Sequence, residues 1–199
     1  MARPKGKTVR RADVIAAALA LLDEDGPDAV TLSRVAERLG LRTPSLYNHV
    51  AGSEDLQQAV VVETLEMAAT AVLSAVQQNL QETDPASYLR QWASSWRAYA
   101  LANPDHVRYM MAAPVDWSSQ PYSPTWEQMT RRIGEALGRL GLSGPEAMHA
   151  GRFLVASTQG FVRLELRGSM GPHGATDQSF TWMLDRAIGA IRAKALTAS

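Results

Sequence analysis

The segment Thr31–Ser53 constrains the fold of this 199-residue chain more than any other. Two apolar stripes at helical spacing lie on either side of a short break at residues 40–42: Val35, Ala36 and Leu39 before it, Leu46 and Val50 after it. Gly40 can adopt the positive φ that ends a helix, and Pro44 suits the first turn of the next helix, with Thr43 expected as its N-cap. Two short helices joined by so tight a turn predict a helix-turn-helix.

The second of these helices carries short hydrogen-bonding side chains on its outer face. In a helix-turn-helix, this helix enters the major groove of DNA with its N-terminal residues towards the bases. Hydroxyls and amides suit base edges and phosphates, and a proline ring suits a thymine methyl group. The outer face is formed by Thr43, Pro44, Ser45, Tyr47, Asn48 and His49. The same periodicity also fits a helical hairpin with a polar face that binds no DNA.

The stretch from residue 8 to residue 60 resembles the DNA-binding signature of the TetR (tetracycline repressor) family in spacing and residue type. The resemblance rests on Thr31, Val35, Ala36, Leu39, Gly40, Leu41, Ser45, Leu46, Tyr47, His49 and Leu56. It implies that operator DNA is contacted by Arg10, Ser33, Arg42, Thr43, Pro44, Ser45, Tyr47, Asn48 and His49. One departure is Ser53, where the family often has a lysine that reaches a phosphate. Ser53 is expected to cap the fourth helix instead.

The net charge of +0 conceals a strong asymmetry along the chain. Residues 1–11 carry five basic side chains and no acidic one; removing these five from the 20 basic residues leaves 15 against 20 acidic residues, a charge of −5. A basic arm on an acidic body is typical of a protein with one DNA-binding end. A solvated, disordered tail is the alternative. Its position directly before the first helix favours contact with phosphate.

Composition excludes several other classes of protein. The chain has no cysteine, so it has neither disulfides nor a thiolate site, which fits a cytoplasmic location. We find no uncharged apolar run near 18 residues, and therefore expect no membrane span. The four histidines have no metal-binding spacing, and there is no glycine-rich phosphate loop or GxSxG motif. We therefore expect no catalytic residues, no metal and no cofactor.

The spacing of apolar residues predicts an all-α protein of about nine helices, with no strand pattern. Residues 1–52 are expected to form a three-helix DNA-binding head, and residues 53–199 a helical ligand-binding and dimerisation bundle. Helices are expected at 8–25, 32–39, 43–50, 53–80, 85–103, 105–111, 125–140, 145–167 and 178–196, with a proline-rich loop at 112–124.

Nearly all the large aromatic side chains lie beyond residue 87, and several share one helical face. They predict an apolar ligand pocket between helices, with a few polar anchors. The expected pocket residues are Trp92, Trp96, Tyr99, Met110, Trp117, Trp126, Met129, His149, Phe153, Gln159 and Phe161. The alternative is that these residues simply pack a core.

The TetR resemblance implies a homodimeric repressor that a small hydrophobic ligand releases from a palindromic operator. In the family, the last two long helices pair with those of a second copy. Small residues would allow that approach or would pack within one subunit: Gly151, Ala156, Gly160, Gly168, Ala187, Gly189 and Ala190. Gln159-Gly160 departs from the histidine-glycine step of one subgroup of the family. An α-helical adaptor that binds a protein partner is the alternative function.

Overall fold

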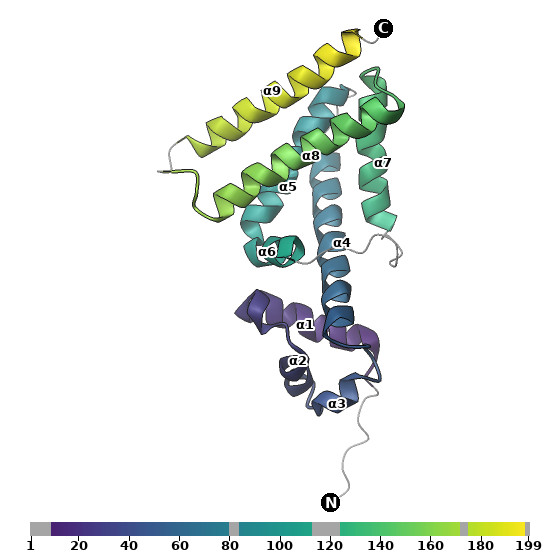
Figure 1. The fold of residues 1–199 in the computed structure, drawn as a ribbon, viewed down its shortest axis with the longest axis vertical. Coiled ribbons are helices and arrows are strands. Elements are labelled where there is room, and N and C mark those ends of the chain that lie inside the picture. Colours follow the sequence, from purple (N-terminus) through teal and green to yellow (C-terminus); the bar gives the residue numbers. More distant parts are fainter. Residues whose placement is uncertain (1–8, 80–83, 113–123, 172–174, 198–199) are drawn as a thin grey trace, which may run out of the picture. The chain divides into compact units, whose positions relative to one another are not determined.

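The computed structural model describes residues 9–79, 84–112, 124–171 and 175–197. Within these ranges the chain forms nine α-helices, one short 3₁₀ turn and no strand (Figure 1), so the all-α prediction is confirmed. The helices are α1 (Arg11–Asp25), α2 (Leu32–Arg38), α3 (Thr43–Leu46), α4 (Ser53–Asn79), α5 (Pro85–Ala102), α6 (Pro104–Ala112), α7 (Pro124–Arg139), α8 (Gly144–Leu166) and α9 (Thr176–Thr197). The predicted loop at 112–124 falls almost wholly outside the described residues.

The chain divides into two compact units that are not contiguous in sequence. The first unit comprises Met1–Leu65 and Asp105–Pro121, and the second Glu66–Pro104 and Tyr122–Ser199. Helix α4 therefore begins in the first unit and ends in the second, whereas nearly all of α6 belongs to the first. The chain passes from one unit to the other three times.

The core of the first unit is built from the apolar faces of its short helices. Buried side chains from α1, α2, α3 and α4 meet there: Val14, Ala18, Leu21, Leu22, Val35, Ala36, Leu46, Leu56, Val60 and Val61. Helix α6 adds Tyr109, which is 6% exposed, and burial raises the pKa of its phenol to about 12. Nearby, the buried His106 pairs its Nε2 with Asp23 Oδ1 of α1 at 2.6 Å. Helix α6 is thus an integral part of this core.

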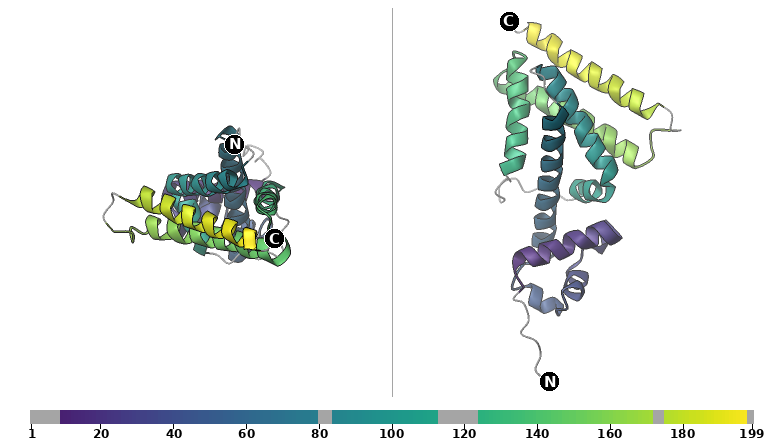
Figure 2. Two further views of the ribbon diagram at one scale, coloured as in Figure 1. Left: turned by 90° about the horizontal axis from the view of Figure 1, so that it is seen from above. Right: turned by 180° about the vertical axis from the view of Figure 1, so that it is seen from behind.

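The second unit is a bundle in which α5 packs against α7, α8 and α9. Helices α8 and α9 lie side by side along one surface of this bundle (Figure 2). The buried face of α8 carries Leu154, Thr158 and Val162 at four-residue spacing, which is the period that one side of a helix requires.

Arg97 of α5 joins three helices of the second unit. Its Nε donates to Glu165 Oε2 of α8 at 2.7 Å, and its Nη2 donates to Asp177 Oδ1 of α9 at 2.6 Å. Its guanidinium also lies 4.9 Å from the centre of the Phe180 ring of α9. The hydrogen bond to Glu165 and the two negative charges raise the pKa of Arg97, so its charge is permanent.

Helix α4 is long and apolar enough, over Ser53–Gln77, to cross a membrane by length and composition alone. Our expectation of no span rested on the absence of an uncharged run, and Glu63 and Glu66 do interrupt this helix. Half of the apolar window is buried inside the protein, which is typical of a core helix.

Candidate nucleic-acid interface and ligand site

The turn of the helix-turn-helix is closed by backbone hydrogen bonds around Gly40. Thr31 caps α2 as predicted, because its Oγ1 accepts from the Arg34 N–H at 3.3 Å. At the other end Gly40 has φ +65°, and the N–H of Leu41 donates to the Ala36 carbonyl at 2.8 Å. A residue with positive φ followed by such a bond is the usual end of a helix at a glycine.

Helix α3 differs from its prediction at both ends. Arg42, not Thr43, occupies the N-cap position, and it makes no capping bond through its side chain, so the prediction for Thr43 was wrong. Thr43 begins the helix, which ends at Leu46 rather than near Val50. Residues 47–49 form a turn, held by bonds from the N–H groups of His49 and Val50 to the Leu46 carbonyl at 2.8 and 3.0 Å.

The apolar and polar sides of α3 and its turn are clearly separated. Leu46 and Val50 are buried in the head core, whereas Tyr47 is 57% exposed. Among the other residues expected to contact DNA, Arg10, Ser33, Arg42, Pro44 and Asn48 are exposed, and Thr43, Ser45 and His49 are half-buried. The surface therefore offers hydroxyl, amide and guanidinium groups to a partner.

Arg11 makes a clamp inside the head that the sequence did not indicate. Its guanidinium donates to both Asp55 oxygens, at 2.8 and 2.6 Å, and to the His49 carbonyl at 2.8 Å. Asp55 also accepts from the Ala51 N–H at 2.8 Å. The hydrogen bond from Arg11 lowers the pKa of Asp55 to about 2. Arg11, which we assigned to the basic arm, thus ties α1 to the end of the turn that follows α3 and to the start of α4.

The remaining basic arm, residues 1–8, lies outside the described residues. Arg10 is the first basic residue of the arm that can be placed; its backbone N–H donates to Asp13 at 2.8 Å while its side chain stays exposed. Ser53, expected to cap α4, is the first residue of that helix. The side chain that accepts a backbone N–H at this end of α4 is Asp55, from Ala51.

In the second unit, α5 carries a row of buried donors. Trp92 and Trp96 are 3% and 4% exposed, and neither indole N–H has a hydrogen-bond partner within the described ranges. Tyr88, four residues before Trp92, has a buried hydroxyl that likewise lacks a partner there, and burial raises its pKa. Since buried polar groups are normally hydrogen-bonded, this row along one helical face is suited to a ligand that carries hydrogen-bond acceptors. Tyr88 was absent from the predicted site.

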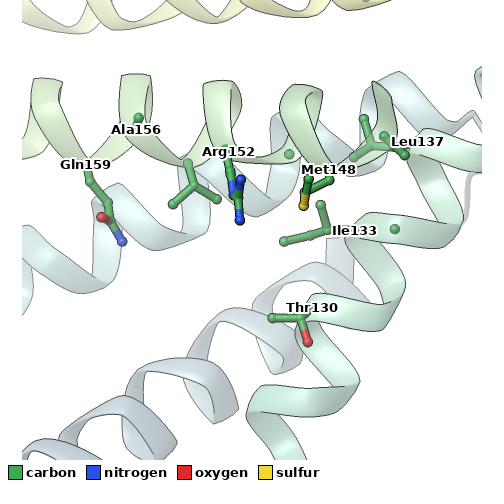
Figure 3. A pocket seen from close by; sticks show the side chains of 11 residues that line it. Thr130, Ile133, Leu137, Met148, Arg152, Ala156 and Gln159 are labelled. Carbon is green, nitrogen blue, oxygen red and sulfur yellow. The ribbon is translucent and has the colours of Figure 1, made fainter. Parts of the chain in front are cut away.

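Two cavities flank α8. The larger, of about 660 Å³, lies between α7 and α8 and is lined mainly by apolar groups, with Thr130, Arg152 and Gln159 as its polar side chains (Figure 3). Of the predicted ligand residues that the structure describes, only Gln159 lines it. His149 and Phe153 line a second cavity of about 300 Å³, which α9 also borders through Ala190 and Ile191.

The other predicted ligand residues are dispersed. Tyr99 lies 6.3 Å from the Trp96 ring, and Phe161 packs edge-on against Phe180 at 5.2 Å. Met129 is buried and Trp126 half-buried on α7, whereas Met110 belongs to the first unit. Trp117 lies outside the described residues. The eleven residues therefore do not line a single described cavity.

Comparisons with known proteins account for both units. Residues 14–60 match the family described as bacterial regulatory proteins, tetR family, and residues 89–187 match the tetracyclin repressor-like C-terminal domain. An HTH-type transcriptional regulator of Mycobacterium tuberculosis is 30% identical over 186 residues, which cover 94% of this chain and 82% of that protein. The chain belongs to the TetR family. It is therefore a DNA-binding transcriptional regulator with a helix-turn-helix head and a ligand-binding C-terminal domain.

Other TetR relatives match over shorter stretches or in fold alone. The class D tetracycline repressor of Escherichia coli is 35% identical over 125 residues, which span 63% of this chain but only 52% of that repressor. Apo ActR of Streptomyces coelicolor shares the fold with a TM-score of 0.72 and 20% identity, over 98% of this chain and 100% of ActR. A TetR variant of Acinetobacter baumannii AYE, solved in complex with minocycline, gives a TM-score of 0.69 and 24% identity, over 93% and 94% of the two chains.

Proposed function

We propose that this TetR-family regulator is a homodimeric, cytoplasmic repressor that a small hydrophobic ligand releases from a palindromic operator. In this proposal residues 1–52 form the DNA-binding domain, and residues 53–199 bind the ligand and the second copy. The observation that carries it is the polar, exposed surface of α3 and its turn, supported from behind by the buried Leu46 and Val50.

DNA binding would use the start of α3 and the turn that follows α3 differently. Arg42 and Thr43 stand at the N-terminal end of α3, which enters the major groove first in a helix-turn-helix, and are suited to base edges. Tyr47 lies after the helix, where its exposed hydroxyl can donate to a phosphate. Because the Arg11 clamp holds the backbone at His49, the position of this turn is fixed before DNA arrives.

Dimerisation is supported by apolar groups that α8 and α9 leave in contact with solvent. Met148, Phe153 and Leu164 of α8 are each about half exposed, and Trp182 of α9 is the most exposed large apolar side chain among those described. Four exposed large apolar side chains on two neighbouring helices favour an interaction surface there. Of the small residues expected to allow close approach, Ala156, Gly160, Gly189 and Ala190 are exposed, whereas Ala187 is buried within one copy.

Ligand binding is supported by the buried donors of Tyr88, Trp92 and Trp96, which need acceptor atoms. An apolar molecule with carbonyl or hydroxyl oxygens would satisfy them. The crystal complex of the Acinetobacter baumannii relative with minocycline is a precedent for a small-molecule ligand in this fold.

The test is selection of DNA fragments by the purified protein, followed by affinity measurement on the selected sequence. Tyr47→Phe should weaken binding by about 1 kcal/mol because one hydrogen bond is removed, and Arg42→Ala by about 1–3 kcal/mol if it reads a base. Arg131→Ala on α7, equally a loss of one exposed arginine, should leave the affinity unchanged.

If no sequence is enriched, or if both head variants bind as tightly as the parent, the repressor proposal fails and an adaptor function is favoured. Retention on heparin separates the two functions independently: a DNA-binding head should be retained and eluted by salt, whereas an acidic adaptor should flow through.

A further inference from the structure

We infer that the groove between α7 and α8 receives Trp182 from a second copy of the chain. The inference rests on the proposed homodimer and identifies one contact across its interface. A two-fold dimer forms this contact twice, since whatever one copy inserts into its partner is also received in return.

The groove has the size and chemistry that an indole ring requires. Its volume of about 660 Å³ is bordered by Ile133 and Leu137 on α7 and by Met148 and Val155 on α8. Glycine and alanine residues line much of the rest, so the space is open rather than filled by flexible side chains; a Cβ added at Gly134 would meet no atom within 4 Å. Among the described residues that line it, none is acidic and Arg152 is the one cation.

Trp182 is exposed in a way that suits insertion. Its side chain is 64% exposed, although tryptophan is among the residue types that gain most from burial. Arg186, one helical turn later, holds its guanidinium carbon 5.6 Å from the centre of the indole ring, which restricts the rotamers available to the ring. A large, partly preorganised aromatic side chain is the usual anchor of a protein interface.

Trp182 does not reach the groove of its own chain. The contact of Phe161 with Phe180 sets the start of α9 beside the C-terminal part of α8, while the groove borders α8 from Ala147 to Gln159 and is not lined by Trp182. Figure 1 accordingly shows α7 and the first turns of α9 at opposite ends of α8. Met148 lines the groove and is itself 46% exposed, so an apolar side chain at the edge of the groove is open to a second copy.

Two variants test the two sides of this contact, with sedimentation of a dilution series as the readout. Trp182→Ala removes the inserted ring, and Gly134→Leu projects a side chain into the groove from a position where its Cβ meets no atom within 4 Å. Each should raise the dimer dissociation constant by at least about 30-fold per contact, hence about a thousand-fold for the symmetric pair. Because both remove one interaction, the double variant should be little weaker than either single variant. Leu101→Ala, which truncates another exposed large apolar side chain, on α5, is the matched control and should change nothing.

A photo-crosslink identifies the partner surface directly. With p-benzoylphenylalanine at position 182, irradiation of the dimer should give a covalent adduct that maps to α7 or α8 peptides of the second copy. Adducts elsewhere, or a dimer that both variants leave intact, would overturn the inference while the homodimer stands. A parent protein that stays monomeric at every concentration would instead reject the homodimer itself. If Gly134→Leu abolishes ligand-induced release from DNA but leaves dimerisation unchanged, the occupant of the groove is the ligand and the inference is wrong.

Discussion

The Arg97 network allows the stability of the second unit to be tested with a defined magnitude. Arg97→Met keeps most of the aliphatic length but removes the donors that satisfy Glu165. Both ion-pair partners have side chains that are only 14% exposed. A fully buried carboxylate that loses its partner costs about 3–5 kcal/mol. Since this pair retains some contact with solvent, we expect about 2–3 kcal/mol.

A double-mutant cycle separates this ion pair from the rest of the network. Glu165→Gln should also cost about 2 kcal/mol, and the double variant should cost little more than Arg97→Met alone, giving a coupling energy of about 2 kcal/mol. Asp177 has an 89% exposed side chain, so Asp177→Asn should cost under about 1 kcal/mol. That variant is the matched control because it removes a carboxylate from the same guanidinium.

The measurement is urea unfolding at pH 7 and a single protein concentration, since dimerisation would make the midpoint depend on concentration. A thermal scan should agree, at about 2–4 °C for each kcal/mol in a chain of this size. A coupling energy below about 0.5 kcal/mol, or an Asp177→Asn effect equal to that of Glu165→Gln, would refute the argument that burial makes the Glu165 pair the dominant one.

Three further predictions concern the head. Asp55→Asn should lower the free energy of unfolding by about 1 kcal/mol at pH 7. Because the pKa of Asp55 is lowered to about 2 in the folded protein, this difference should be present above the ordinary pKa of 3.8 and disappear as the pH falls towards 2. Urea unfolding of both proteins across that pH range measures it. Gly40→Ala should cost about 1 kcal/mol through its φ of +65° alone, since an added Cβ meets nothing within 4 Å; a neutral effect in thermal unfolding would contradict the assigned turn. Deletion of residues 1–8 should weaken binding to specific and random DNA equally. The slope of log affinity against log salt concentration should fall by about 0.9 for each phosphate that the arm neutralises. An unchanged slope would identify the arm as a solvated tail.

The sequence predicted the helices well because apolar spacing reports directly on local conformation. Helix α4 was expected at 53–80 and is observed at Ser53–Asn79, and α7 was expected at 125–140 and is observed at Pro124–Arg139. The end of α3 was overestimated because Tyr47 and Asn48 continue the helical period of their neighbours, although the backbone there is already in a turn.

Contacts between helices were much harder to predict. Arg11 and Asp55 are 44 positions apart, and nothing in the periodicity of either helix pairs them. The predicted ligand residues were chosen for chemical type. Trp96 nevertheless lies on the buried face of α5, whereas Phe153 of α8 lines the cavity between α8 and α9. Which face of a helix meets which neighbour depends on crossing geometry, and local spacing does not contain that information.

The inclusion of α6 in the first unit limits how such regulators can be recombined. A chimaera that joined residues 1–65 to an unrelated effector domain would leave out Tyr109, and the resulting void would lie in the core that α1 to α4 build. Asp23 would also lose its histidine partner. A transplantable DNA-binding module from this chain must therefore bring its own substitute for α6, or be grafted onto a recipient whose sixth helix presents the same side chains.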